Sequence, residues 1–118
     1  MYLIPENFDP GFLLNKKLEM VCIAAYHISL HFSSDIMIQI EGNVEFSSTK
    51  LKDTNQSWRP QFPPDKFLSC IESKIVGSRT EDKRNLIITF ENATLVRILS
   101  NPLYECFRIS YAGNEIIV

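Results

Sequence analysis

The stretch that decides the fold runs from residue 86 to residue 98 and reads Leu-Ile-Ile-Thr-Phe-Glu-Asn-Ala-Thr-Leu-Val-Arg-Ile. Leu86, Ile88 and Phe90 alternate with their neighbours, and the alternation resumes at Thr94 after a polar interruption at residues 91–93. A period of two residues is typical of a β-strand with one buried face. The stretch therefore predicts a β-hairpin that turns within the polar interruption.

The chain contains the same pattern a second time, at residues 28–40, which read Ile-Ser-Leu-His-Phe-Ser-Ser-Asp-Ile-Met-Ile-Gln-Ile. Phe32 corresponds to Phe90 and Ile40 to Ile98, with a constant offset of 58 residues. Two hairpins on one template predict a duplicated unit. We expect the copies to bury their Phe-bearing faces against each other or within one continuous sheet.

Length and composition indicate one globular domain that spans residues 1–118. The chain has 118 residues, of which 45% are hydrophobic and 22% are charged, and this is enough for one core and too little for two. The formal net charge is −2, which disfavours a purely electrostatic grip on nucleic acid or on an anionic membrane.

The pattern of apolar residues and the spacing of the cysteines favour a cytoplasmic protein. The N-terminal residues lack the basic region and apolar core of a signal peptide. The apolar run from Met20 to Tyr26 is too short to cross a bilayer. Cys22, Cys70 and Cys106 are odd in number and widely spaced, which is typical of free thiols in a reducing compartment.

The first half of the chain predicts a β-meander. Residues 18–32 indicate strands that break near Ala24 and Ala25, although the Ala pair leaves a helix over residues 18–26 as an alternative. A further strand is expected at Val44-Glu45-Phe46. The polar span from Ser47 to Asp65 reads as a long loop between the two repeats.

The second half predicts a short helix followed by another meander. Pro63-Pro64 is a helix-start signal before residues 65–71, and one helical turn is also expected near Phe12. Gly113-Asn114 predicts a two-residue type II′ turn before the last strand. The predicted fold is α+β and β-rich, with two related antiparallel β-meander units, Leu18–Ser47 and Lys74–Val118, and one or two short helices.

The sequence contains no motif for catalysis, for a metal or for a cofactor, so we do not expect an enzyme. On a strand, the spacing of His27 and His31 separates their Cα atoms by about 13 Å, which is too far for both to bind one metal ion. The four glycines are isolated, so no phosphate-binding loop is expected. We therefore interpret the chain as one that acts by binding.

Two places carry residue types that are common in interfaces. Trp58 and Arg59 lie in the long polar loop, and Trp and Arg are enriched at binding hot spots. The alternative is that Trp58 folds back with Phe62 to cover one end of the core. Tyr104 and Glu105 form the second place, where the alternative is a strand-start aromatic that packs on its neighbour.

The second hairpin, with Tyr104-Glu105 and the closing residues 113–118, resembles a family of small bacterial proteins with a duplicated β-meander. Members of that kind occur among immunity proteins of polymorphic toxin systems, including contact-dependent growth inhibition. The resemblance implies a cytoplasmic protein that binds and neutralises the C-terminal domain of a cognate toxin, with a nuclease as the expected class. A nuclease presents a basic surface, so the resemblance implies acidic contact residues, for which Glu41, Glu45 and Asp53 are the candidates, with Trp58 and Arg59 as anchors.

Two other functions stay open as alternatives. A nucleic-acid-binding β-module is suggested by aromatic residues on strands and by the basic pair Lys83-Arg84, although Glu81-Asp82 adjoins that pair. A small-ligand-binding protein or enzyme would instead have its cleft between the two repeats.

Overall fold

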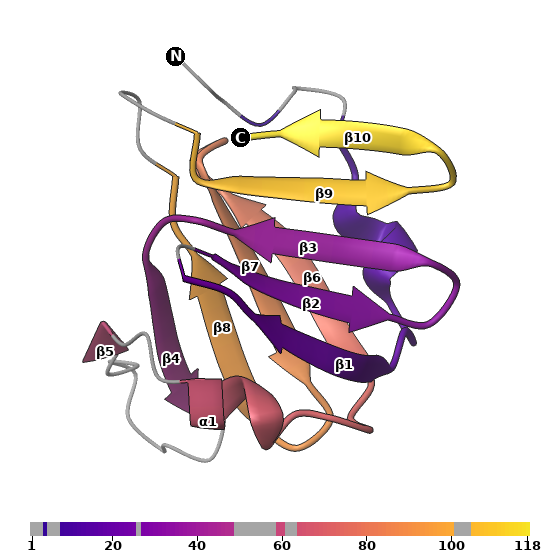
Figure 1. Cartoon of the computed structure of the whole chain (residues 1–118), viewed down its shortest axis with the longest axis vertical. Helices are drawn as coiled ribbons and strands as arrows, with labels where there is room; N and C mark the ends of the chain where they lie inside the picture. The colour runs from indigo at the N-terminus through magenta and orange to yellow at the C-terminus, as the bar shows by residue number, and fades with distance from the viewer. Residues whose placement is uncertain (1–3, 5–7, 26, 49–58, 61–63, 101–104) are drawn as a thin grey trace.

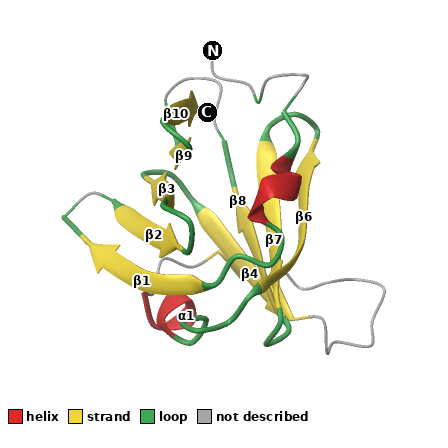
Figure 2. Ribbon diagram, turned by 90° about the vertical axis from the view of Figure 1, so that its right-hand side faces the viewer, coloured by secondary structure: helices red, strands yellow, loops and turns green. Residues whose placement is uncertain are grey.

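The computed structural model describes residue 4 and the ranges 8–25, 27–48, 59–60, 64–100 and 105–118. Within these residues, ten strands form two antiparallel sheets of five strands each, with one α-helix and one 3-10 helix (Figures 1 and 2). In chain order the elements are η1 Pro10–Leu13, β1 Leu18–Ile23, β2 Ile28–Phe32, β3 Ile36–Ile40, β4 Val44–Ser48, β5 Arg59–Pro60, α1 Pro64–Leu68, β6 Ile75–Glu81, β7 Asn85–Phe90, β8 Thr94–Ile98, β9 Phe107–Tyr111 and β10 Asn114–Ile117.

The two sheets do not coincide with the two halves of the chain. The strand order is β1-β2-β3-β9-β10 in one sheet, here called sheet A, and β5-β4-β8-β7-β6 in the other, sheet B. Each sheet thus contains one meander of three consecutive strands and receives its fourth and fifth strands from elsewhere in the chain. Figure 1 shows the strands of sheet A crossing in front of those of sheet B.

This exchange of strands between the two halves of the chain corrects the prediction that the first half is a single meander. β4 leaves sheet A and pairs with β8, with Val44 opposite Ile98, whereas β9 pairs with β3, with Ile38 opposite Ile109. The segments Leu18–Ser47 and Lys74–Val118 are therefore not separate sheets. Sequence alternation gives the buried face of each strand but not the identity of its neighbour, so it could not predict the exchange.

A close chain crossing makes the exchange possible. The N–H groups of Glu41 and Gly42 both donate to the carbonyl of Cys106, at 2.7 and 2.9 Å, just where the chain leaves sheet A. A Cβ atom on Gly42 would lie 3.0 Å from the Cβ of Cys106. The absence of a side chain on Gly42 thus lets the chain leaving β3 pass next to the chain entering β9.

The core lies between the two sheets and is built from the alternating apolar residues. The phenyl rings of Phe32 and Phe90, at equivalent positions of the two hairpins, stack with a centroid distance of 6.4 Å. Phe67 of α1 lies edge-on to Phe46 of β4, with centroids 5.0 Å apart. The Phe-bearing faces of the two hairpins therefore face each other and do not form one continuous sheet.

The two sheets are also joined along the backbone at one corner. Lys17 and Lys74 form an isolated antiparallel bridge next to the first residues of β1 and β6. Around it, the N–H of Leu18 donates to the carbonyl of Ser73 at 3.1 Å, and the N–H of Ile75 donates to the carbonyl of Lys16 at 2.9 Å. These bonds satisfy backbone groups that burial would otherwise leave unpaired.

Several local predictions agree with the structure. Residues 18–23 form a strand, so the helix alternative over residues 18–26 is wrong, and the strands break around Ala24 and Ala25 as predicted. One helical turn occurs at η1, where the carboxylate of Asp9 accepts from the N–H of Gly11 at 2.9 Å. The helix expected at residues 65–71 is shorter, since α1 spans Pro64–Leu68 and a turn follows it.

The last hairpin turns one residue earlier than predicted. Tyr111 pairs with Asn114, so the turn residues are Ala112 and Gly113, with φ angles of 50° and 79°. Two positive φ angles define a type I′ turn in place of the predicted type II′ turn at Gly113-Asn114. The register that buries Ile109 and Val118 therefore places an alanine in the left-handed region, which costs free energy for a residue with a Cβ.

This strain generates a stability prediction. Ala112→Asn creates the Asn-Gly pair that type I′ turns prefer, and should raise the free energy of unfolding by about 0.5–1 kcal/mol. For a domain of this size we expect the melting temperature to rise by about 2–5 °C. Circular dichroism melting measures the effect. Ala25→Asn is the matched control, because Ala25 is also an exposed alanine but has no positive φ; equal melting temperatures for the two variants would contradict the assignment.

Candidate partner-binding surface

The residues predicted for partner binding fall into three groups in the structure. Asp53, Trp58 and Tyr104 lie outside the described residues. Arg59 is described only as the first residue of β5, opposite Phe46. Glu41, Glu45 and Glu105 are described with their side chains, and they belong to two different places on the molecule.

Glu41 and Glu105 lie around Arg108, which is on β9 and points away from the core of sheet A. Nη2 of Arg108 donates to Oε1 of Glu105 at 2.9 Å, and Nε of Arg108 forms an ion pair with Oε1 of Glu115 at 2.7 Å. Glu41 follows β3 and accepts from the side-chain amide of Gln39 at 3.0 Å. We call these four charged residues, Glu41, Glu105, Arg108 and Glu115, the Arg108 cluster.

Strand pairing brings this cluster together from three separate parts of the chain. Arg108 lies opposite Gln39 of β3 on one side and opposite Ile117 of β10 on the other. On β10, Glu115 lies opposite Ser110, which is two residues from Arg108 and on the same face of the strand. The exchange of β9 into sheet A is therefore what places Arg108 near Glu41.

The cluster holds more negative than positive charge. A hydrogen bond to Glu105 raises the pKa of the Arg108 guanidinium, burial opposes this change, and the charges of Glu115, Glu105 and Glu41 add to the rise. The arginine therefore stays protonated and compensates only one of the three carboxylates. The side chains of Glu105 and Glu115 are 27% and 45% exposed, so the negative charge is accessible at the surface.

Neither Arg108 nor Glu115 was among the predicted residues. With the turn placed at Gly113-Asn114, Glu115 would lie opposite Ala112 and away from Arg108. The observed turn shifts the register and brings Glu115 next to Ser110. A type I′ turn that ends in Gly113 would have predicted the observed register. In that register Glu115 lies opposite Ser110 and Ile117 lies opposite Arg108.

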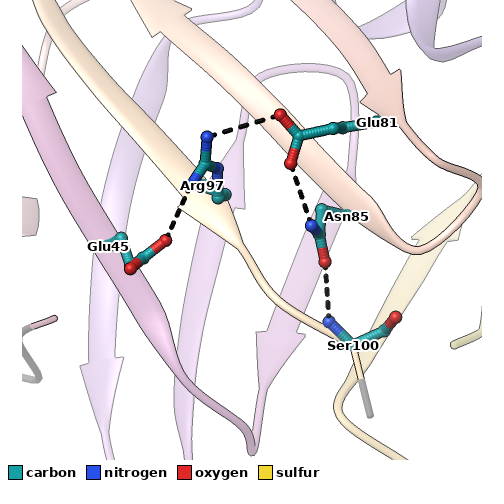
Figure 3. A network of polar contacts seen from close by, with 5 residues as sticks. All are labelled: Glu45, Glu81, Asn85, Arg97 and Ser100. Carbon is teal, nitrogen blue, oxygen red and sulfur yellow. Dashed lines mark hydrogen bonds and ion pairs between the residues drawn. The ribbon is translucent and has the colours of Figure 1, made fainter. Parts of the chain in front are cut away.

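Glu45 belongs to a different arrangement, on the outer face of sheet B (Figure 3). Nη1 of Arg97 donates to Oε1 of Glu45 at 3.0 Å, and Nη2 donates to Oε2 of Glu81 at 3.3 Å. The chain of contacts continues as Asn85 donates to Glu81 at 3.0 Å, and as the N–H of Ser100 donates to Asn85 at 3.2 Å. These side chains connect β4, β8, β6 and β7.

The two arginines differ in exposure. The side chains of Arg97, Glu45 and Glu81 are 21%, 20% and 28% exposed, whereas Arg108 is 36% exposed. Less exposed ion pairs are less screened by water and hold their partners in fixed positions. We therefore interpret the Arg97 network as part of the framework of sheet B and the Arg108 cluster as the candidate partner-binding surface.

Other candidate chemistry is not assembled among the described residues. No group of three or more His, Cys, Asp and Glu side chains there could hold a metal ion. Cys70 and Cys106 are buried, whereas Cys22 is exposed on β1. No helix in the described part of the chain is long and apolar enough to cross a membrane.

Comparison with known proteins returned nothing: the chain matches no family model, no curated protein and no solved structure. The geometry and the charge of the surface therefore carry the functional proposal.

The Arg97 network generates a second stability prediction. Arg97→Met leaves Glu45 and Glu81 without their shared cation, and should lower the free energy of unfolding by about 1–3 kcal/mol. Arg79→Met is the matched control, because Arg79 is an exposed arginine of β6 on the same outer face, opposite Ile87. We expect the control to change stability by less than about 0.5 kcal/mol. Urea unfolding of the two variants tests the prediction, which is wrong if they lose equal stability.

Proposed function

We propose that this chain is a cytoplasmic immunity protein that binds and neutralises the C-terminal domain of a cognate bacterial toxin, with a nuclease as the toxin class. The Arg108 cluster is proposed as part of the binding surface. The observation that carries the proposal is the convergence of three carboxylates on one arginine at an accessible place on sheet A. The resemblance of the second hairpin to immunity proteins supplies the biological setting.

The geometry of the cluster suits recognition of a basic protein surface. Arg108 holds Glu105 and Glu115 in defined positions, so less side-chain entropy is lost when a partner binds. The excess negative charge would raise the rate of association with a basic surface and would disfavour acidic partners. Ile117 is 40% exposed opposite Arg108, and offers an apolar contact beside the charges.

The structure also bears on the alternatives. The space between the two sheets is filled by buried apolar side chains, including the stacked Phe32 and Phe90, which disfavours a ligand cleft there among the described residues. The charge of Glu81 is shared with Arg97, so the acidic residues beside Lys83-Arg84 are partly neutralised. This arrangement favours the nucleic-acid alternative only weakly, because the exposed Asp82 remains next to Lys83.

We infer, as part of the same proposal, that the chain arose by duplication of one unit. An offset of 58 residues in the numbering places β2 on residues 86–90 of β7 and β3 on β8. After each of these hairpins the next strand crosses to the opposite sheet, as β4 and β9. An ancestral unit that formed a two-fold pair by exchanging its last strands would account for both observations.

Co-expression tests the proposed function directly. The C-terminal domain of the large protein encoded immediately upstream should arrest growth when expressed alone, and this chain should restore growth and co-purify with it. Growth arrest that this chain does not relieve, with no stable complex, would contradict the proposal. Salt-sensitive binding to oligonucleotides in the same preparation would instead support the nucleic-acid alternative.

Charge removal tests the surface. Glu41→Gln combined with Glu115→Gln should slow association with the toxin domain about threefold to tenfold at low salt, because long-range attraction is weakened. The difference should shrink at about 0.5 M salt, where charges are screened within a few ångströms. The matched control is Glu72→Gln combined with Glu91→Gln, which removes two exposed carboxylates elsewhere. Biosensor association rates distinguish the surfaces, and equal slowing in both double variants would refute the assignment to the Arg108 cluster.

A further inference from the structure

Within the described residues the two sheets have four edges, and three of these edges carry features that prevent further strand pairing. The described part of β5 includes Pro60, a residue without a backbone N–H. β10 has four residues and carries Glu115. β6 has a register irregularity between Ile75 and Gly77, and η1 packs on it, with the hydroxyl of Ser78 donating to the carbonyl of Pro10 at 2.8 Å.

β1 is the remaining edge, and it lacks such protection over most of its length. The backbone of Leu18 is occupied, because its N–H donates to Ser73 and its carbonyl accepts from Glu72 at 2.8 Å. From Met20 onward, β1 is the outermost strand of sheet A among the described residues. Figure 2 shows α1 beneath the first half of β1, while the arrowhead half of the strand extends beyond the helix.

The free part of this edge is apolar and uncharged. Residues 20–25 read Met-Val-Cys-Ile-Ala-Ala. Met20 is 48% exposed and Ile23 is 57% exposed, which makes Ile23 the most exposed large hydrophobic side chain of the described residues. An exposed apolar edge without charge is a template for pairing with another strand.

Hydrogen-bond alternation shows which backbone groups are free. The N–H of Ala24 donates to the carbonyl of His27 at 2.9 Å, which closes the turn between β1 and β2. Along an antiparallel pair, every second residue bonds to the partner strand, so Cys22 and Met20 continue the bonded set toward β2. The N–H and carbonyl groups of Val21 and Ile23 therefore point to the open edge.

We propose that a second copy of this chain occupies this edge, through antiparallel pairing of β1 with β1 about a two-fold axis at Cys22. Cys22 lies between Val21 and Ile23, the two residues whose backbone groups point to the open edge, so a two-fold axis at Cys22 lets both residues pair. It places Val21 opposite Ile23 of the other copy. The outward-pointing N–H and carbonyl groups of each residue then pair with those of the other. Glu19 faces residue 25 of the other copy and not another Glu19, so no like charges oppose each other.

Self-pairing is favoured over another occupant by charge as well as by register. The stretch offers no charge that would select an acidic or a basic partner strand, and the net charge of −2 gives little repulsion between two copies. A two-fold interface is self-complementary, and one continuous ten-stranded sheet would result. This inference does not depend on the proposed function, since Arg108 and Glu115 lie on β9 and β10 at the opposite side of sheet A from β1.

The first test measures mass in solution. Light scattering after gel filtration, loaded at about 100 µM to exceed a micromolar dissociation constant, should give twice the 13.6 kDa mass of one chain. Ile23→Lys should give the mass of one chain, because a lysine on the edge prevents strand pairing. Val76→Lys is the matched control, since Val76 is 54% exposed on the edge of sheet B, and it should remain a dimer. A wild-type protein of single-chain mass would overturn the proposal, as would an Ile23→Lys variant of dimer mass.

The second test uses Cys22 and needs no destabilising change. Across the two-fold axis the two Cys22 residues form a non-hydrogen-bonded pair, with Cα atoms about 4.5 Å apart, within the range of a disulfide. Diamide should therefore join two chains: the two thiols lose two protons and two electrons, which reduce the azo group of diamide to a hydrazine. Cys22→Ser should abolish the cross-link, whereas Cys70 and Cys106 are buried. A wild-type dimer without this cross-link would overturn the register.

Discussion

The exchange of β4 and β9 between the two sheets is the constraint on which the rest of the structure depends. Each three-stranded meander has one apolar face, and the two faces meet at the stacked rings of Phe32 and Phe90. Because each sheet borrows strands from the other half of the chain, neither half can bury its apolar face alone. The backbone crossing at Gly42 and Cys106 is the point where both transfers meet.

Each pairing that involves an exchanged strand, β4 with β8 and β9 with β3, has an arginine on the outer face of its sheet. Arg97 of β8 lies opposite Glu45 of β4, and Arg108 of β9 lies opposite Gln39 of β3. The Arg97 network is more shielded from water and joins four strands, whereas the Arg108 cluster is more exposed and holds excess carboxylate. Similar chemistry thus serves the framework in sheet B and offers a charged surface in sheet A.

Only part of the candidate surface could be predicted from the sequence. Glu41 and Glu105 were predicted as contact residues, and both lie around Arg108. Glu45 was expected to share a surface with Glu41 but lies on sheet B, because a side chain's neighbours across a sheet depend on strand pairing. Glu115 was missed because a turn placed one residue late moves it away from Arg108, since each step in register changes the facing residue.

The sequence by itself determined the two hairpins, the break near Ala24-Ala25, the short helix and the buried face of most strands. These features follow from alternation and turn chemistry within a few neighbouring residues. Only the tertiary structure decided that β4 joins β8 and β9 joins β3, and therefore which charged residues meet. Pairing between distant strands is set by the burial of both apolar faces at once and by the close approach at Gly42, and neither is encoded in local periodicity.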